Sequence, residues 1–218
     1  MKFRFAYYVS ALLVTLSGSL FAQSTDNKSP YVFPEFVKGS VSQKGGGVAE
    51  AVLNYNVITQ EMMFDQNGSR LVLDQADNID TLYIANRKFI PARSVYFEKL
   101  TNTSIPLFVQ FKGKAVPVGS SKPGGESNTV GGMNGTKKSD DAQKLTSYNL
   151  QLPDNYVLKA SNEYWVQKEG AFYPANNLKK LVKLFSGKEA AIEAYIKENN
   201  LRIDNQADMI KLVVFANK

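Results

Sequence analysis

Cysteine and histidine are both absent from this chain of 218 residues. Without cysteine the protein forms no disulfide and has no N-terminal cysteine to carry a lipid anchor. Without histidine it has no Ser-His-Asp or Cys-His nucleophile, no His-ligated zinc and no imidazole acid or base. Any catalysis would have to use carboxylates, Lys, Tyr, Ser or Thr. These absences favour a protein that binds over one that reacts, so we expect no enzymatic activity and no cofactor.

Long apolar runs are also scarce, and the most prominent one belongs to an export signal over residues 1–22. Lys2 and Arg4 form a positive n-region, residues 5–16 are almost wholly apolar, and Ala22 is a small residue suited to the cleavage point. The run is too short for a permanent membrane helix, and no later run of about 18 apolar residues follows. We expect cleavage after Ala22, a periplasmic or secreted bacterial protein that is not a lipoprotein, and no membrane span in the mature chain.

Charge excess is small and dispersed. The formal net charge is +6, and Lys2 and Arg4 of the signal contribute two of these charges. A dispersed excess is typical of a solvated surface and not of a nucleic-acid footprint. Removing 22 residues from 218 leaves 196, enough for a well-buried domain without disulfides. We therefore expect no nucleic-acid partner.

Short strands separated by turns fill residues 31–174, the predicted β-rich body. Leu53, Tyr55 and Val57 alternate with polar residues, which predicts a half-buried strand. Asn67-Gly68 predicts a hairpin turn between strands at 61–64 and 70–73. Further strands are predicted at 81–84, 88–90, 95–100, 107–118, 147–152, 156–158, 163–167 and 171–173, with turns at Asn86-Arg87 and Glu169-Gly170. Residues 23–30 are predicted to be a flexible leader, and residues 119–141, rich in Gly, Ser and Asn, a disordered surface loop.

After Pro174 the apolar period changes from 2 to 3.6, which predicts three short helices over residues 175–218. Their apolar positions are Leu178, Leu181, Val182 and Phe185, then Ala191, Ile192, Tyr195 and Ile196, then Met209, Leu212, Val213 and Ala216. Ser186 with Glu189 predicts a capping box for the second helix, Asn199-Asn200 its end, and Asn205 or Asp204 the cap of the third. The fold class is therefore α+β: a mostly antiparallel β-meander, as a curved sheet or sandwich, with the three C-terminal helices packed on it.

Glycine-rich and acidic segments offer weak candidate sites. Residues 45–47 lack the spacing of a phosphate-binding loop and predict a turn. Asp65, Asp74, Asp77 and Asp80 do not meet the spacing of a calcium loop, so acidic turns are favoured. Glu61 and Asp65 share one strand face and could act as a glycosidase pair. However, Met62 and Phe64 then face the core, which leaves the two carboxylates toward solvent without an apolar pocket.

Four aromatic residues, Tyr164, Trp165, Phe172 and Tyr173, cluster in the last predicted hairpin. They could form a stacking platform for a sugar or peptide, or could pack the hairpin, which is favoured. Tyr164 and Trp165 point to opposite faces, so at most one is expected in the core. The C-terminal helices lack the basic and aromatic faces of membrane-surface helices. No catalytic, cofactor-binding or metal-binding residue is assigned.

Two stretches carry a resemblance to a known family. The segment AVLNYNVITQEMMFDQNGSRLVL, followed by IDTLYIANRKFI, resembles uncharacterised secreted proteins of Gram-negative bacteria, which pair a "YN…EM.F" segment with a "V…I.…F" hairpin. The tail LKKLVKLFSGKEAAIEAYIKENNLRIDNQADMIKLVVF is similar to their short-helix C-terminus. The resemblance implies export and an α+β domain, and it implies no activity, ligand or catalytic residue.

Three functions fit these observations. The leading hypothesis is an exported non-enzymatic domain that binds a protein or a cell-envelope component. A second is a periplasmic carrier of a lipid or other apolar ligand, held between the sheet and the helices. A third is a carboxylate-based carbohydrate-active enzyme, which would need two carboxyl groups about 5–10 Å apart in a cleft.

Overall fold

The computed structural model describes residues 29–74, 76–92, 94–118, 152 and 154–218. The predicted export signal (1–22), most of the predicted leader (23–30), the predicted loop (119–141) and the strand predicted at 147–152, except Leu152, lie outside the described residues.

The described residues form strands up to Pro174 and helices from Leu178 onward, apart from one short 3₁₀ turn. The strands are β1 (Val37–Gln43), β2 (Val48–Asn56), β3 (Glu61–Gln66), β4 (Ser69–Val72), β5 (Ile79–Ile84), β6 (Arg87–Ala92), β7 (Val95–Lys99), β8 (Leu107–Gln110), β9 (Gly113–Pro117), β10 (Tyr156–Ala160), β11 (Glu163–Lys168) and β12 (Ala171–Pro174). The helices are α2 (Leu178–Val182), α3 (Glu189–Glu198) and α4 (Gln206–Ala216), and the turn is η1 (Ala76–Asn78).

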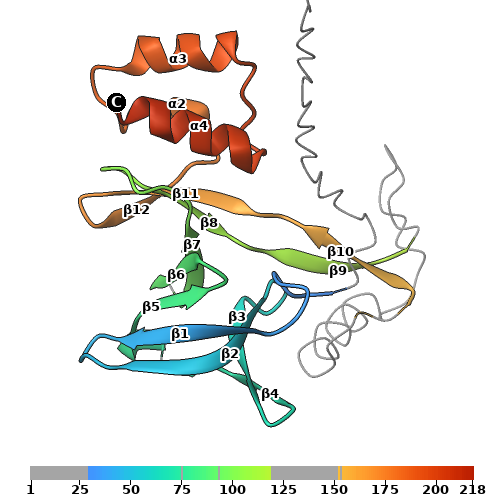
Figure 1. The fold of residues 1–218 in the computed structure, drawn as a ribbon. Coiled ribbons are helices and arrows are strands. Elements are labelled where there is room, and N and C mark those ends of the chain that lie inside the picture. Colours follow the sequence, from blue (N-terminus) through green and yellow to red (C-terminus); the bar gives the residue numbers. More distant parts are fainter. Residues whose placement is uncertain (1–28, 75, 93, 119–151, 153) are drawn as a thin grey trace, which may run out of the picture.

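One large antiparallel sheet organises the molecule. Its ten strands run in the order β12-β11-β8-β7-β6-β5-β1-β2-β3-β4, and β9 pairs with β10 in a separate two-stranded sheet. The helices lie over the end of the sheet that holds β8, β11 and β12, far from β1 and β2 (Figure 1). The predicted α+β class, with a curved antiparallel sheet and three short C-terminal helices, is confirmed.

The N-terminal half of the sheet curls on itself. β3 and β7 are separated by four strands in the sheet order, yet they lie against each other. The side chains enclosed by this curl form what we call the N-terminal core: Phe33, Val41, Leu53, Tyr55, Val57, Ile58, Met62, Ile79, Leu82, Ile84, Phe89, Tyr96 and Leu152. Alternation along β2 and β3 supplies this core, because every second residue of a strand faces the same side.

The C-terminal half of the same sheet face is covered by the helices. Register connects Phe89 to Glu98, Glu98 to Val109 and Val109 to Tyr164, so Val109 and Tyr164 share a face with the N-terminal core. Helix residues pack on them to form the C-terminal core: Leu107, Val109, Tyr164, Val166, Ala175, Leu181, Val182, Phe185, Ile192, Met209, Leu212, Val213 and Ala216. Four apolar residues were predicted to form the buried face of the third helix, and all four are buried in α4: Met209, Leu212, Val213 and Ala216.

The strand predicted from Leu107 to Val118 is wrong as a single element. It divides into β8 and β9, which belong to different sheets. The division has a long-range cause: the Gly113 N–H donates to the carbonyl oxygen of Val57 at 2.9 Å. A side chain at Gly113 would also meet Val57 and Leu158 at under 3 Å. Phe111, at the break, packs against both cores.

Some of the predicted turns and helix caps are confirmed, and others are wrong. Asn67-Gly68 forms the predicted turn with φ of 55° and 86°, but the β5–β6 turn lies at Ala85-Asn86, one residue earlier than predicted. The Ser186 capping box is wrong, since α3 starts at Glu189 after Lys188 and has no side-chain cap bond. The Lys188 N–H donates to the Phe185 carbonyl, so residues 185–188 form a turn in place of a cap.

Other helix signals are borne out. The Asn205 side chain caps α4 by accepting from the Asp208 N–H at 3.1 Å, as predicted. Asn199 and Asn200 follow the last residue of α3. None of the helices in the described ranges has the length and apolar character needed to cross a membrane.

Candidate functional site

A hollow of about 510 Å³ lies on the outer face of β1, β2 and β5, on the side of these strands away from the N-terminal core. We call it the Tyr83 hollow. Its lining consists of Lys38, Gly39, Ser40, Glu50, Ala51, Val52, Tyr83, Ala85 and Asn86. The volume falls within the range of about 300–1,000 Å³ that is usual for small-molecule sites.

Cross-strand register explains why the hollow forms here. Glu50 pairs with Ser40, Ser40 with Tyr83, and Tyr83 with Lys88, so four side chains cross β2, β1, β5 and β6 in one row. Ser40 is small and stands between the larger Glu50 and Tyr83. The row therefore has a gap in its middle, with a carboxylate on one side and an aromatic ring on the other.

Gly39 forms part of the floor. Its position allows β1 to approach β5 closely, because a Cβ there would lie 2.4 Å from the Tyr83 carbonyl oxygen and 3.1 Å from a Leu53 methyl group. The Ala85-Asn86 turn, with φ of 48° and 62°, places Asn86 at one end of the hollow. Rigid, hydrogen-bonded strands thus position the lining.

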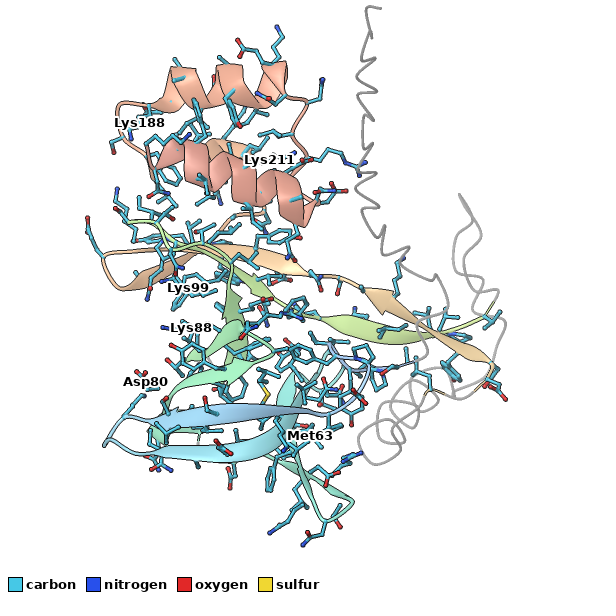
Figure 2. The ribbon with its side chains drawn as sticks, in the orientation of Figure 1. Met63, Asp80, Lys88, Lys99, Lys188 and Lys211 are labelled. Carbon is cyan, nitrogen blue, oxygen red and sulfur yellow. The ribbon has the colours of Figure 1, made fainter. Side chains whose placement is uncertain are left out.

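The Tyr83 ring is the most informative part of the lining. Tyr83 is 45% exposed although it is a large aromatic residue in the interior of the sheet. The Lys88 ammonium lies 5.9 Å from the ring centroid, and Figure 2 shows Lys88 near Lys99, its cross-strand partner on β7. The exposed ring offers an apolar surface, and Lys38, Ser40, Glu50 and Asn86 around it can donate and accept hydrogen bonds.

Burial and ion pairing displace the pKa values of three groups outside the Tyr83 hollow. Burial raises the pKa of Tyr96 to about 12 and also raises that of Tyr55, and both side chains lie in the N-terminal core. The Arg202 guanidinium, hydrogen-bonded to Asp204, lowers the pKa of that exposed carboxyl near the start of α4. None of these three groups lines the Tyr83 hollow. What its lining offers is contact surface and hydrogen bonds.

The aromatic residues predicted to cluster in the last hairpin divide between the two sheet faces. Tyr164 is buried in the C-terminal core, and Tyr173 is 40% exposed. Trp165 stacks on Phe97 with ring centroids 5.5 Å apart, and the Phe172 ring meets Phe97 at 5.2 Å. Packing of Trp165 and Phe172 is confirmed.

The prediction that at most one of Tyr164 and Trp165 lies in the core is confirmed: Tyr164 is buried in the C-terminal core, whereas Trp165 is half-buried on the opposite face of the sheet. β7 and β12 are separated by two strands, and adjacent strands lie about 4.8 Å apart. Phe97 and Phe172 therefore meet only because the sheet bends toward this face. That bend is opposite to the curl around the N-terminal core.

The acidic candidates are placed as follows. Met62 and Phe64 face the N-terminal core as predicted, and Glu61 and Asp65 are half-buried on the opposite side of β3. Asp65 forms an ion pair with Arg70 and accepts from the Gly68 N–H at 3.0 Å, which gives it a role in the turn. Across the described residues, no group of three or more acidic side chains is arranged to hold a metal ion.

Sequence reasoning missed the Tyr83 hollow. Tyr83 was assigned only to a strand, and residues 37–43 carried no prediction of their own. Serine at position 40 opposite Tyr83 becomes visible only after strand order and register are known.

The fold and the hollow define an α+β protein with a polar-aromatic depression on an antiparallel sheet. Comparisons with known protein families, curated proteins and solved structures find no match to this chain. The resemblance to secreted Gram-negative proteins therefore stays a prediction, and function has to be argued from the site itself.

Proposed function

We propose that this protein is an exported, non-enzymatic binding domain that holds a saccharide of the bacterial envelope in the Tyr83 hollow. The observation that carries the proposal is the 45% exposed Tyr83 ring beside a floor of small residues. A sugar ring has an apolar C–H face and a rim of hydroxyl groups. The Tyr83 ring suits the first, and the surrounding polar side chains suit the second.

The charges of the lining favour a sugar of low net charge. Lys38 and Glu50 carry opposite charges, and Ser40 and Asn86 add neutral donors and acceptors. A strongly anionic or cationic ligand would meet one like charge in this small space. Neutral hydroxyl and acetamido groups meet no such penalty.

The size of the hollow favours a saccharide over a folded protein. A stable protein interface covers about 800 Å² on each partner and is centred on buried anchors. A hollow of about 510 Å³ with one exposed ring instead has the size of a small-molecule site. The export signal expected over residues 1–22 would deliver the domain to a compartment where such polymers are found.

A co-sedimentation assay tests this proposal. The chain from Gln23 onward is mixed with purified peptidoglycan sacculi, chitin or cellulose, and the bound fraction is measured. We expect at least one polymer to retain the protein, and Tyr83→Ala to weaken retention by about tenfold, the equivalent of about 1.4 kcal/mol.

Tyr173→Ala is the matched control, because Tyr173 is a 40% exposed tyrosine on β12 and does not line the hollow. It should bind like the unmodified chain. Equal loss in both variants, or sedimentation with none of the three polymers, would contradict the proposal. Retention by a protein component left on unpurified sacculi, and not by the purified polymer, would instead indicate a protein partner.

The geometry of the described residues gives less support to the other two predicted functions. The largest side chains of the N-terminal core, including Tyr55, Phe89 and Met62, are completely buried against one another. The carboxylate pair of an enzyme would include Asp65, which Arg70 already engages. The apolar-carrier and glycosidase hypotheses stay predictions.

A further inference from the structure

The first half of β2 pairs with a described strand on one edge only. β1 pairs with β2 along residues 48–53, whereas β3 pairs with β2 only from Val52 to Asn56. Residues 48–51 therefore have β1 on one side and no described strand on the other. Val48, at the beginning of this segment, is 69% exposed.

The hydrogen-bond pattern indicates which backbone groups point to this edge. The Gln43 N–H donates to the Gly47 carbonyl at 3.1 Å, so residues 43 and 47 form a hydrogen-bonded pair. In an antiparallel ladder such pairs alternate, which makes Ala49 and Ala51 the β2 residues that bond to β1. The N–H and C=O groups of Val48 and Glu50 consequently point to the unpaired edge.

A groove of about 380 Å³ lies beside this edge, on the inner side of the sheet. We call it the inner groove, and its lining is Val41, Gln43, Ala49, Glu50, Ala51, Phe64, Asp65, Gln66, Leu73, Asp74, Asn78 and Ile79. Its apolar members come from β1, β2, β3, the segment after β4 (Leu73) and the start of β5 (Ile79). An unpaired edge and an apolar groove thus share Ala49 and Ala51.

We propose that an extended peptide strand from a partner protein adds to β2 at Val48–Ala51 and places one apolar side chain in the inner groove. Exposed strand edges are templates for pairing, and added strands gain affinity from backbone bonds and specificity from pockets for alternate side chains. This site opens on the other side of the sheet from the Tyr83 hollow, although Glu50 and Ala51 border both.

The charge of the groove specifies the peptide further. Three acidic residues border the groove or its edge: Asp74, and Glu50 and Asp65, whose side chains lie on the outer side of β2 and β3. Among the described lining residues there is no Lys or Arg. Arg70 neutralises Asp65 from outside the lining. The bound strand should therefore alternate apolar residues with Lys or Arg, and it should lack acidic residues.

Selection from a phage-displayed library of random peptides, with the chain from Gln23 onward as the target, provides the probe. We expect enrichment of peptides with the apolar–basic alternation. One enriched peptide is then synthesised with a fluorescent label and its affinity measured by anisotropy. Val48→Pro removes an N–H that points to the unpaired edge and should weaken binding at least tenfold.

Val48→Thr is the matched control, since threonine keeps the N–H and the strand propensity, and it should bind within about twofold. Ala49→Arg tests the groove independently, because it fills the space and adds a positive charge without removing a donor. It should also weaken binding at least tenfold. Circular dichroism checks that the variants remain folded.

The inference fails if the selected peptides lack the alternation, or if they bind Val48→Pro and Ala49→Arg as tightly as the unmodified chain. Tyr83→Ala should leave peptide binding unchanged. A peptide that loses affinity in Tyr83→Ala but not in Val48→Pro would place its site in the Tyr83 hollow and overturn the strand-addition proposal.

Discussion

At the scale of single residues, small side chains determine where the surface is hollow. Ser40 leaves the gap between Glu50 and Tyr83, and Gly39 allows β1 to lie close to β5 behind it. Neither residue has a chemical function that a motif search would detect. Their effect comes from the volume that they do not fill.

Gly39→Ala should therefore destabilise the protein by about 1–3 kcal/mol, the usual cost of forcing a methyl group into packed structure. The added Cβ would lie 2.4 Å from the Tyr83 carbonyl oxygen, a backbone atom that cannot rotate away. Urea unfolding measures the change. Gly45→Ala is the control, because nothing lies within 4 Å of a Cβ at that position. Similar unfolding midpoints for the two variants would show that the approach of β1 to β5 is not tight.

At the scale of secondary-structure elements, the sequence predicts the turns and caps that depend on residues close together along the chain. Hairpins at Asn67-Gly68 and Glu169-Gly170 and the α4 cap at Asn205 all rest on local signals, and all were found. The break between β8 and β9 depends on Val57, more than fifty residues away. The Tyr83 hollow needs three strands in register, which no local pattern specifies. The predicted Ser186 cap is wrong because residues 185–188 form a turn between α2 and α3.

One ion pair between neighbouring strands stabilises the fold, and no local sequence pattern predicts it. Arg87 on β6 donates two hydrogen bonds of 2.7 Å to Glu98 on β7, whose side chain is 8% exposed. The Arg87 guanidinium also lies 4.7 Å from the ring centroid of Phe33 and 5.2 Å from that of Phe111. It thus joins β6 and β7 to the N-terminal segment and to the β8–β9 break.

Arg87→Lys should destabilise the protein by about 1.5–3 kcal/mol, because lysine keeps the charge but cannot make both bonds or cover the rings. Arg202→Lys is a matched control. Arg202 makes the same two-bond pair with Asp204, but the pair is exposed and solvent screens it, so its unfolding midpoint should be unchanged. Thermal unfolding of both variants measures the difference. An equal shift in both would show that burial adds nothing to the Arg87–Glu98 pair.

At the scale of the whole molecule, two cores depend on one sheet that bends in opposite directions. The N-terminal core fills the curl of β1 to β7, and the C-terminal core lies between β8, β11 and the helices. Phe111 packs against both cores, and register runs without interruption from Phe89 to Tyr164. Loss of either core would leave one face of shared strands exposed to water. The two halves should therefore unfold together.

Two probes report on the sheet and on the helices separately. Trp165 is the only tryptophan of the chain and stacks on Phe97, so its fluorescence reports on the bend of the sheet. Far-ultraviolet circular dichroism reports mainly on the helices. We expect the two signals to give one coincident transition in urea.

Substitutions in each core extend the test. Leu82→Ala in the N-terminal core and Leu212→Ala in the C-terminal core should each cost about 2–5 kcal/mol, because both side chains are almost completely buried. Each should move the fluorescence and dichroism transitions by the same amount, since one cooperative unit has one midpoint. If Leu212→Ala moved only the dichroism transition, the helices would unfold independently of the sheet. In that case the register from Phe89 to Tyr164 would not couple the two cores.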